Sequence, residues 1–324
     1  MINPYEGVNW GTFQHIQSTT HMHHDAACSM MQEDGFKHLA ISNYYPSKPV
    51  LDYKNIVNPK WANPDVLPDG MIGSPNAEHH NSFVDGQQYG GFHFNSLGST
   101  WESGQEEGKT PIGVQKDWRI AFRGILDTLK YKDGGGITIN HPPWTGLSLA
   151  HAIRFLDYDE RVLGIEIFNA PVTDPNAWAL DFWDELLKTG RRVWGFCVTD
   201  HPNKDERPFQ GRSVLIVDKF TEEECLKAYR EGRFYGKIYN TDLRFTELKY
   251  SDGKVTAKTN NATSMKVIVD GEETVVNASE VTYTVPDDAT YVRIEAHTDG
   301  DSIFSNPFIL KPRKKRGMNK LMWY

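Results

Sequence analysis

The sequence predicts an α/β domain followed by a smaller all-β domain, and a change of apolar pattern carries this prediction. Up to about residue 236, short apolar runs alternate with stretches in which apolar residues recur every three or four positions. This alternation is typical of strand–helix units in a parallel sheet or barrel. After Tyr239 the apolar period changes to two, and turn signals such as Asp252-Gly253 and Asp270-Gly271 separate the runs, which predicts antiparallel strands. We therefore expect two domains, residues 1–239 and 240–324.

The elements of the first domain follow from these runs. Its expected strands are Phe13–Ser18, His38–Ser42, Gly91–Leu97, Gly136–Asn140, Leu163–Asn169, Val193–Thr199 and Ser213–Asp218. Helices are expected at Trp118–Leu129, Asp174–Lys188 and Thr221–Gly232. Thr221 and Glu224 also form a capping box, which marks the start of the last helix. His15 and His38 lie inside expected strands and are interpreted as residues at the edge of the core.

The second domain is expected to be a small antiparallel β-sandwich. Its expected strands are Val255–Lys258, Met265–Val269, Val281–Val285 and Tyr291–Ala296. The basic tail Lys311–Arg316 follows them and is interpreted as a solvated chain end, with a binding role as the alternative.

Composition and charge exclude several classes of protein. The chain has 324 residues, 39% of them hydrophobic, and a formal net charge of −8, so we expect a sizeable core and no general nucleic-acid-binding function. No apolar run is long enough to cross a membrane, and Met1–Tyr5 lacks the layout of a signal peptide. Cys28, Cys197 and Cys225 form no CxxC pair. We therefore expect reduced thiols in a cytoplasmic protein with no nucleic-acid or membrane partner.

Imidazole and carboxylate side chains occur where expected strands end. Five segments contain them: His21 with His23, Glu78, His93, His141, and Asp200 with His201. His21 and His23 face the same side of an extended strand, because side chains alternate between its faces. Buried groups of this kind would stay unsatisfied unless they converge on cations. The pattern predicts a metal centre, and nitrogen and carboxylate ligands without thiolate suit zinc, manganese or iron.

The order and spacing of these segments resemble those of the PHP family, named for polymerase and histidinol phosphatase. The resemblance covers roughly residues 12–236 and rests on His21-x-His23, Gly35–Tyr44, Glu78 before His93, Asn140-His141-Pro142, Gly164–Asn169 and Val198–His201. It implies a distorted (β/α)7 TIM-like barrel that acts as a metal-dependent phosphoesterase. Gly232–Tyr235 and the β domain that ends in Ser305-Asn306-Pro307 resemble the branch with carbamate-hydrolysing relatives.

The resemblance also implies the ligands of two divalent metal ions. His21, His23, Glu78 and Asp200 would hold the first ion, and Glu78, His93 and His141 would hold the second, with Glu78 bridging them. A water shared by both ions would be the nucleophile, because two cations lower its pKa and stabilise the attacking and leaving oxygens.

The sequence departs from the family where a third metal ion would bind. Asn43-Tyr44 stand in place of Asp-His, Ser29 stands in place of an acid or imidazole, and His201 follows Asp200 directly. We therefore expect a binuclear site in which Tyr44 and His201 contact the substrate or transfer protons. The alternative is a third ion, held by a site rebuilt from His24, His79 and His80.

Three functions remain open from the sequence. The first is hydrolysis of a small phosphorylated molecule, with Asn169 hydrogen-bonding near the site and Arg212 binding the phosphate. A salt bridge is the alternative role of Arg212. The second is hydrolysis of a carboxylic ester, amide or carbamate on the same metals, because no basic cluster accompanies the ligand motifs. The third is a non-catalytic binding protein on a degenerate barrel.

Three tryptophans lie in expected loops near the mouth of the barrel: Trp61, Trp101 and Trp144. They could stack on a sugar or an aromatic substrate, or they could anchor their loops. The oligomeric state does not follow from the sequence.

Overall fold

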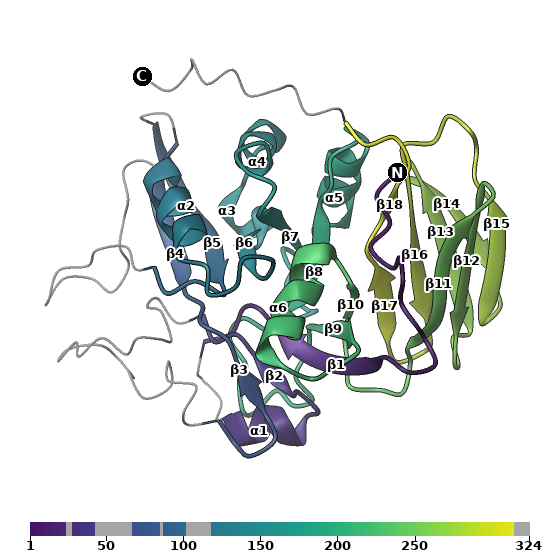
Figure 1. Ribbon diagram of the computed structural model, residues 1–324, viewed down its shortest axis with the longest axis horizontal. Helices are drawn as coiled ribbons and strands as arrows, with labels where there is room; N and C mark the ends of the chain where they lie inside the picture. Colours follow the sequence, from purple (N-terminus) through teal and green to yellow (C-terminus); the bar gives the residue numbers. More distant parts are fainter. Residues whose placement is uncertain (24–27, 43–66, 85–86, 102–117, 314–324) are drawn as a thin grey trace, which may run out of the picture.

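A computed structural model describes residues 1–23, 28–42, 67–84, 87–101 and 118–313. These residues form a mixed α/β structure that is rich in sheet and has short helices (Figure 1). The helices are α1 (Cys28–Glu33), α2 (Trp118–Asp127), α3 (Pro142–Thr145), α4 (Leu149–Leu156), α5 (Leu180–Leu187) and α6 (Glu222–Glu231). No helix within the described ranges is both long and apolar enough to cross a membrane.

A five-stranded sheet carries several of the expected strand ends. Its strands, in spatial order, are β4 (Glu78–Val84), β5 (Gln87–Leu97), β6 (Gly136–Ile139), β7 (Val162–Asn169) and β8 (Trp194–Val198). The strands β6, β7 and β8 run parallel, whereas β5 is antiparallel to both of its neighbours. Phe92 of β5 contacts Phe122 of α2 and Phe155 of α4, so both helices cover the same face of this sheet.

A ten-stranded sheet contains strands from the beginning and the end of the chain. Its strands, in spatial order, are β14 (Glu272–Val276), β13 (Ser264–Val269), β16 (Tyr291–His297), β17 (Ser302–Ser305), β10 (Phe234–Lys237), β9 (Arg212–Val217), β1 (Gln14–Thr19), β2 (His38–Leu39) and β3 (Ile72–Gly73), while β18 (Phe308–Ile309) pairs with β16 off this path. The three strands β1, β2 and β3 are parallel, but β9 is antiparallel to β1 and to β10.

The distorted (β/α)7 TIM-like barrel is not confirmed. Its strands would be parallel and separated by helices, but β4 and β5 pair antiparallel and follow each other closely in the chain. Antiparallel neighbours need only a short connection, so no helix has to lie between them. The described strands form separate sheets instead of one continuous ladder. The coarser expectation of a mixed α/β fold holds.

Single backbone hydrogen bonds link the two larger sheets at the strand ends. His23 N–H donates to the Asp200 carbonyl (2.6 Å), and Asp200 N–H donates to the His21 carbonyl (2.9 Å). A third bond links β4 to the residues that follow β2: Glu78 N–H donates to the Ser42 carbonyl (2.9 Å). These bonds hold the residues that follow β1 and β8, and the first residue of β4, at neighbouring positions.

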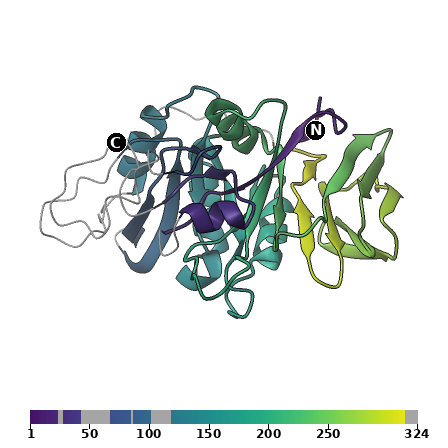
Figure 2. The same cartoon turned by 90° about the horizontal axis from the view of Figure 1, so that it is seen from below.

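The strands after Tyr239 gather at one end of the molecule (Figure 2). The three strands β11 (Phe245–Ser251), β12 (Lys254–Thr259) and β15 (Glu280–Thr284) form a sheet of their own. One hydrophobic cluster joins Val255 and Val281 of this sheet to Val267 and Ile294 of the ten-stranded sheet. An independent sandwich is not confirmed, because β16 and β17 continue through β10 into the ten-stranded sheet. The domain boundary after Tyr239 stays a prediction.

Candidate metal centre

Glu78, the first residue of β4, lies at the centre of a cluster of histidines. Its Oε1 is 3.5 Å from His21 Nε2, 3.1 Å from His93 Nδ1 and 3.3 Å from His141 Nε2. Its Oε2 is 3.1 Å from His23 Nε2 and 3.3 Å from His80 Nε2. Glu78 is only 4% exposed. Burial opposes ionisation of this carboxyl, but the surrounding imidazoles outweigh it, so the pKa of Glu78 lies well below 4.5.

Asp200 reaches the same cluster from the end of β8. Its Oδ1 is 3.1 Å from His21 Nε2 and 3.5 Å from His23 Nε2. Asp200 is buried and has a φ of 54°, a left-handed conformation that non-glycine residues adopt infrequently. Burial raises the pKa of the carboxyl, but neighbouring imidazoles, above all His21, hold it below its usual value.

The structure brings all six expected ligands together. Four groups have ligand atoms that lie within 4.8 Å of one another: His21 with His23 and Glu78, His23 with Asp200 and His201, Glu78 with His80 and His93, and His21 with His141 and Glu166. Because the groups share members, they form one continuous centre. Its donors are imidazole nitrogens and carboxylate oxygens, which suit a divalent transition metal.

Two buried atoms test whether this centre fits a cation. His21 Nε2 and Asp200 Oδ1 have no hydrogen-bond partner among the described residues, although they lie 3.1 Å apart. A buried polar atom without a partner costs free energy, and a cation between a nitrogen and a carboxylate oxygen would satisfy both. The residues present therefore fit a metal ion.

Glu166 fixes the orientation of His21. The His21 ring is fully buried, and its Nδ1 is 2.7 Å from Glu166 Oε1. Burial disfavours the imidazolium of His21, but three surrounding carboxylates, led by Asp200, outweigh burial and raise the pKa of His21 well above 6.5. A carboxylate on Nδ1 leaves Nε2 directed at Glu78 and Asp200, which is the usual way in which a metal-binding histidine is oriented.

Two asparagines position the carboxylates. Asn169, at the end of β7, donates from Nδ2 to Glu166 Oε2 and to Asp200 Oδ2, both at 2.9 Å. Asn140, which follows β6, donates from Nδ2 to Glu78 Oε1 at 3.1 Å. Asn169 is buried and bonded to carboxylates, so its contacts are those of a positioning residue. Its expected contact with substrate stays a prediction.

His141 adopts its position through a turn between β6 and α3. Its φ is 24°, and its backbone N–H donates to Glu166 Oε2 at 2.8 Å. Pro142 and Pro143 follow and begin α3, because proline at the first helical position has the required φ and needs no hydrogen-bond partner. A non-glycine residue in this conformation is strained and persists where its surroundings hold it.

The structure describes one of the two expected catalytic residues, His201. The His201 side chain is 56% exposed, its ring stacks on His23 with centroids 4.4 Å apart, and its Nε2 is 3.6 Å from Asp200 Oδ1. It therefore lies at the edge of the centre. Tyr44 and His24 lie outside the described residues.

The contacts of Arg212 contradict the prediction that this residue binds the substrate phosphate. It is fully buried, and its guanidinium donates to Gln17 Oε1, to the Asp34 carbonyl, to Asp34 Oδ2 and to the Phe209 carbonyl. Both terminal nitrogens are thus bonded within the protein. The salt bridge with Asp34 (3.2 Å) makes Arg212 a structural residue.

The structure also contradicts part of the alternative in which His24, His79 and His80 hold a third metal ion. His79 is directed away from the centre: its Nε2 is 3.0 Å from Ser96 Oγ, and its ring stacks on Phe94. His80 does join the centre, and its ring stacks on His93 with centroids 3.5 Å apart. Strand alternation separates the two histidines. The spacing Glu78-x-His80 is the sequence signal that indicates the shared face.

Two of the three tryptophans expected in loops lie among the described residues, and Trp144 belongs to α3 instead of a loop. Trp101 is an anchor, because a Cβ at Gly124 would lie 2.0 Å from its Nε1, and its ring is 5.2 Å from that of His79. Trp144 is 48% exposed, and its ring centroid is 5.9 Å from that of His141. Trp61 falls outside the described ranges.

Comparison with known proteins places few constraints on this chain. No family model and no curated protein matches it. Among solved structures, it is similar to a two-domain protein from Bacteroides vulgatus that contains a predicted PHP-like metal-dependent phosphoesterase, with 14% sequence identity and a TM-score of 0.46. The alignment covers 97% of this chain and 95% of that chain. A likeness of this degree decides neither the family nor the reaction.

Proposed function

We propose that this protein is a metal-dependent hydrolase that cleaves a phosphoester of a small molecule. The observation that supports this most directly is the buried carboxylate of Glu78 surrounded by imidazoles. Beside it, His21 Nε2 and Asp200 Oδ1 have no hydrogen-bond partner in the described part of the chain. Structural histidines normally find protein partners when they are buried. Membership of the PHP family, in the branch with carbamate-hydrolysing relatives, is part of this proposal.

The residues present would hold two divalent ions. In this proposal, the first is bound by His21, His23, Glu78 and Asp200, and the second by Glu78, His93 and His141. Bound ions of this kind lower the pKa of a water and polarise the phosphoryl oxygen. Zinc, manganese and iron all suit the donors, and His80 provides a further nitrogen for a third ion.

The protein's own side chains perform the remaining tasks. Glu166 and Asn169 hold His21 and Asp200 in position, so little reorganisation is needed when substrate binds. His201 is exposed at the edge of the centre and is proposed to donate a proton to the oxygen of the leaving group. Tyr44 retains its expected role in substrate contact or proton transfer as part of the proposal.

One observation favours the alternative substrate, a carboxylic ester, amide or carbamate. Among the described residues, no Lys or Arg forms an ion pair with Glu78 or Asp200, and Arg212 is bonded elsewhere. A phosphate group is normally bound by such cations or by the metals themselves. The metal centre alone would then have to bind the phosphate.

A comparison of substrates tests the proposal. The metal-loaded protein is assayed with an aryl phosphate and with the aryl ester and aryl carbamate of the same phenol, beside a His21→Asn variant. We expect the phosphate to be cleaved fastest and the variant to lose at least about 100-fold in kcat/KM. A His151→Ala variant, which removes an imidazole outside the centre, should retain wild-type rates. Faster cleavage of the ester or carbamate would establish the alternative, and retention of metal without any hydrolysis would indicate a binding protein.

A further inference from the structure

A pocket lies beside the candidate metal centre and shares one residue with it. The pocket is a hollow open to solvent, and it is lined by residues that follow β7 and by the loop between β8 and β9. His201 lines the pocket and also belongs to a group with His23 and Asp200 whose ligand atoms lie within 4.8 Å of one another. A molecule in the pocket would therefore lie next to the centre.

The pocket offers hydrogen-bond donors in fixed orientations. Asn203 Oδ1 accepts from the backbone N–H of Asp205 (3.1 Å), and Gln210 Oε1 accepts from the backbone N–H of Val172 (2.6 Å). Each bond fixes an amide group while its NH₂ donates no hydrogen bond to the described part of the chain. These two NH₂ groups are available to a ligand.

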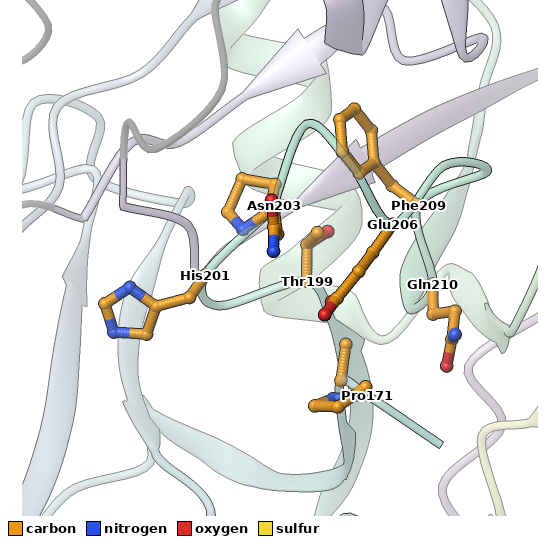
Figure 3. Close-up of a pocket in the computed structure, with 9 residues that line it drawn as sticks. Pro171, Thr199, His201, Asn203, Glu206, Phe209 and Gln210 are labelled. Carbon is orange, nitrogen blue, oxygen red and sulfur yellow. The ribbon is translucent and has the colours of Figure 1, made fainter. Parts of the chain in front are cut away.

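Glu206 supplies the acceptor. In Figure 3 its carboxylate points toward Thr199 and Pro171, whereas the imidazole of His201 points to the other side. Phe209 and Pro171 add apolar surface to the lining. Donor amides, a carboxylate acceptor and apolar surface together suit a group that carries hydroxyls on a carbon skeleton.

The charge of the pocket disfavours an anion. No Lys or Arg is among its lining residues, and Glu206 adds a negative charge. Lys204 and Arg207 belong to the same loop but do not line the pocket, and Arg207 pairs with Glu33 at 3.0 Å. A second phosphate or a carboxylate in this pocket would face Glu206 with no cation among the lining residues to compensate it, and like-charge repulsion makes this unfavourable.

We propose that this pocket binds the leaving group of the substrate and selects an uncharged, hydroxyl-bearing group. The inference rests on the hydrolase function proposed above, because it assigns the phosphoryl group to the metal centre.

Two phosphate esters of nearly the same shape test this selectivity. Glycerol 1-phosphate and 3-phosphoglycerate differ at the far end of the molecule, where the first has a hydroxymethyl group and the second a carboxylate. Their dissociation constants are measured by calorimetry with the metal-loaded protein, and kcat/KM is measured wherever hydrolysis occurs. We expect wild type to favour glycerol 1-phosphate by about tenfold or more. The Glu206→Lys variant should reverse the preference, and Glu6→Lys, a charge reversal at an exposed residue of the N-terminal segment, should not.

The ratio of the two dissociation constants decides whether the subsite exists. Equal binding of the two esters by wild type, the same ratio in Glu206→Lys, or no binding of either ester would overturn the subsite. Metal analysis of the same samples separates this failure from failure of the hydrolase proposal: a metal-loaded, active protein with an unchanged ratio lacks only the subsite. A protein that takes up no metal lacks the proposed function itself.

Discussion

Glu166 shows how a single side chain can organise a metal centre without being one of its expected ligands. Its two oxygens accept three hydrogen bonds, one from the His21 ring, one from the His141 backbone and one from Asn169. All three partners are donors, so only a carboxylate satisfies them together. An amide would direct its own NH₂ at one of these donors.

Replacement of Glu166 by Gln tests this arrangement. We expect metal affinity to fall by about 10- to 100-fold, because the orientation of His21 is lost along with one negative charge. Affinity is measured by competition with a coloured chelator. Glu185→Gln, at an exposed position on α5, is the control and should bind metal as wild type does. Unchanged affinity in Glu166→Gln would show that His21 needs no support from Glu166.

Arg212 gives a contrasting prediction at the same scale. It forms a buried ion pair with Asp34, and removing one partner of such a pair leaves an uncompensated charge. We expect Arg212→Ala to lower the free energy of unfolding by about 3–5 kcal/mol, measured by urea denaturation. The KM for a phosphate ester should not change at temperatures where the variant is folded. A raised KM with unchanged stability would restore the phosphate-binding role.

These residues differ in how far sequence reasoning could predict them. The expected ligands follow from strand alternation and from polar residues at strand ends, which are local signals. Glu166 lies in an otherwise apolar strand, and its partner His21 is distant in the chain, so no local pattern indicates their contact. The structural role of Arg212 likewise depends on Asp34, a residue distant in the chain, so no local pattern indicates it.

At the level of elements, β4 is one of the strands that apolar patterning does not predict. Its residues begin Glu78-His79-His80, so polar side chains lie on both of its faces and leave no hydrophobic period to detect. Glu78 and His80 face the metal centre, while His79 is buried against Ser96 and Phe94. The polar face of this strand exists because it carries the site.

Adjacent substitutions on β4 test this orientation. We expect His80→Ala to weaken metal binding by about tenfold while stability changes little, because His80 faces the centre. His79→Ala should instead lower the free energy of unfolding by about 2 kcal/mol through loss of buried packing, with metal affinity retained. Chelator competition and urea denaturation measure both effects. The reverse pattern would mean that the strand is rotated.

The helix expected at Asp174–Lys188 is shorter than its sequence pattern. It begins at Leu180, because the preceding residues bond to β7: Asn169 N–H donates to the Ala177 carbonyl (2.9 Å), and Ala179 N–H donates to the Ile167 carbonyl (3.0 Å). Tertiary hydrogen bonds here override helix propensity. By contrast, one half of the capping box, a local signal, is confirmed: the Thr221 side chain accepts from Glu224 N–H. The carboxylate of Glu224 instead pairs with Arg233.

At the scale of the whole molecule, strand positions were more predictable than strand partners. Every strand expected in residues 1–239 overlaps a strand of the structure. The pairing of β10 with β17, which joins residues on both sides of the expected domain boundary, involves contacts far apart in the chain. Such non-local pairings leave no trace in periodicity, and for this reason the sheet arrangement could not be derived.

Buried histidines away from the centre make the stability of the fold depend on pH. His38 is fully buried between Ser18 Oγ (2.7 Å) and Ser74 Oγ (2.9 Å), and burial lowers its pKa from 6.5 to about 3. Between these values the unfolded chain binds a proton at this position and the folded chain does not. Stability therefore falls as pH decreases from about 6.5 to 3 and is unaffected by His38 above that window.

The variant His38→Gln isolates this contribution. Within the window, its free energy of unfolding should fall less steeply than that of wild type, by about 1.4 kcal/mol per pH unit. Urea denaturation at a series of pH values measures the two slopes. Parallel slopes would show that His38 is protonated in the folded protein.

The metal content of the chain tests the central claim most directly. Protein purified without added metal or an affinity tag is examined by elemental analysis, before and after titration with zinc, manganese and iron, beside Glu78→Ala. Circular dichroism establishes that the variant is folded. We expect about two equivalents of metal per wild-type chain, lost together in the variant, because Glu78 contacts ligands of both proposed ions. No metal in wild type, and none taken up on titration, would contradict the metal centre and the hydrolase function proposed from it.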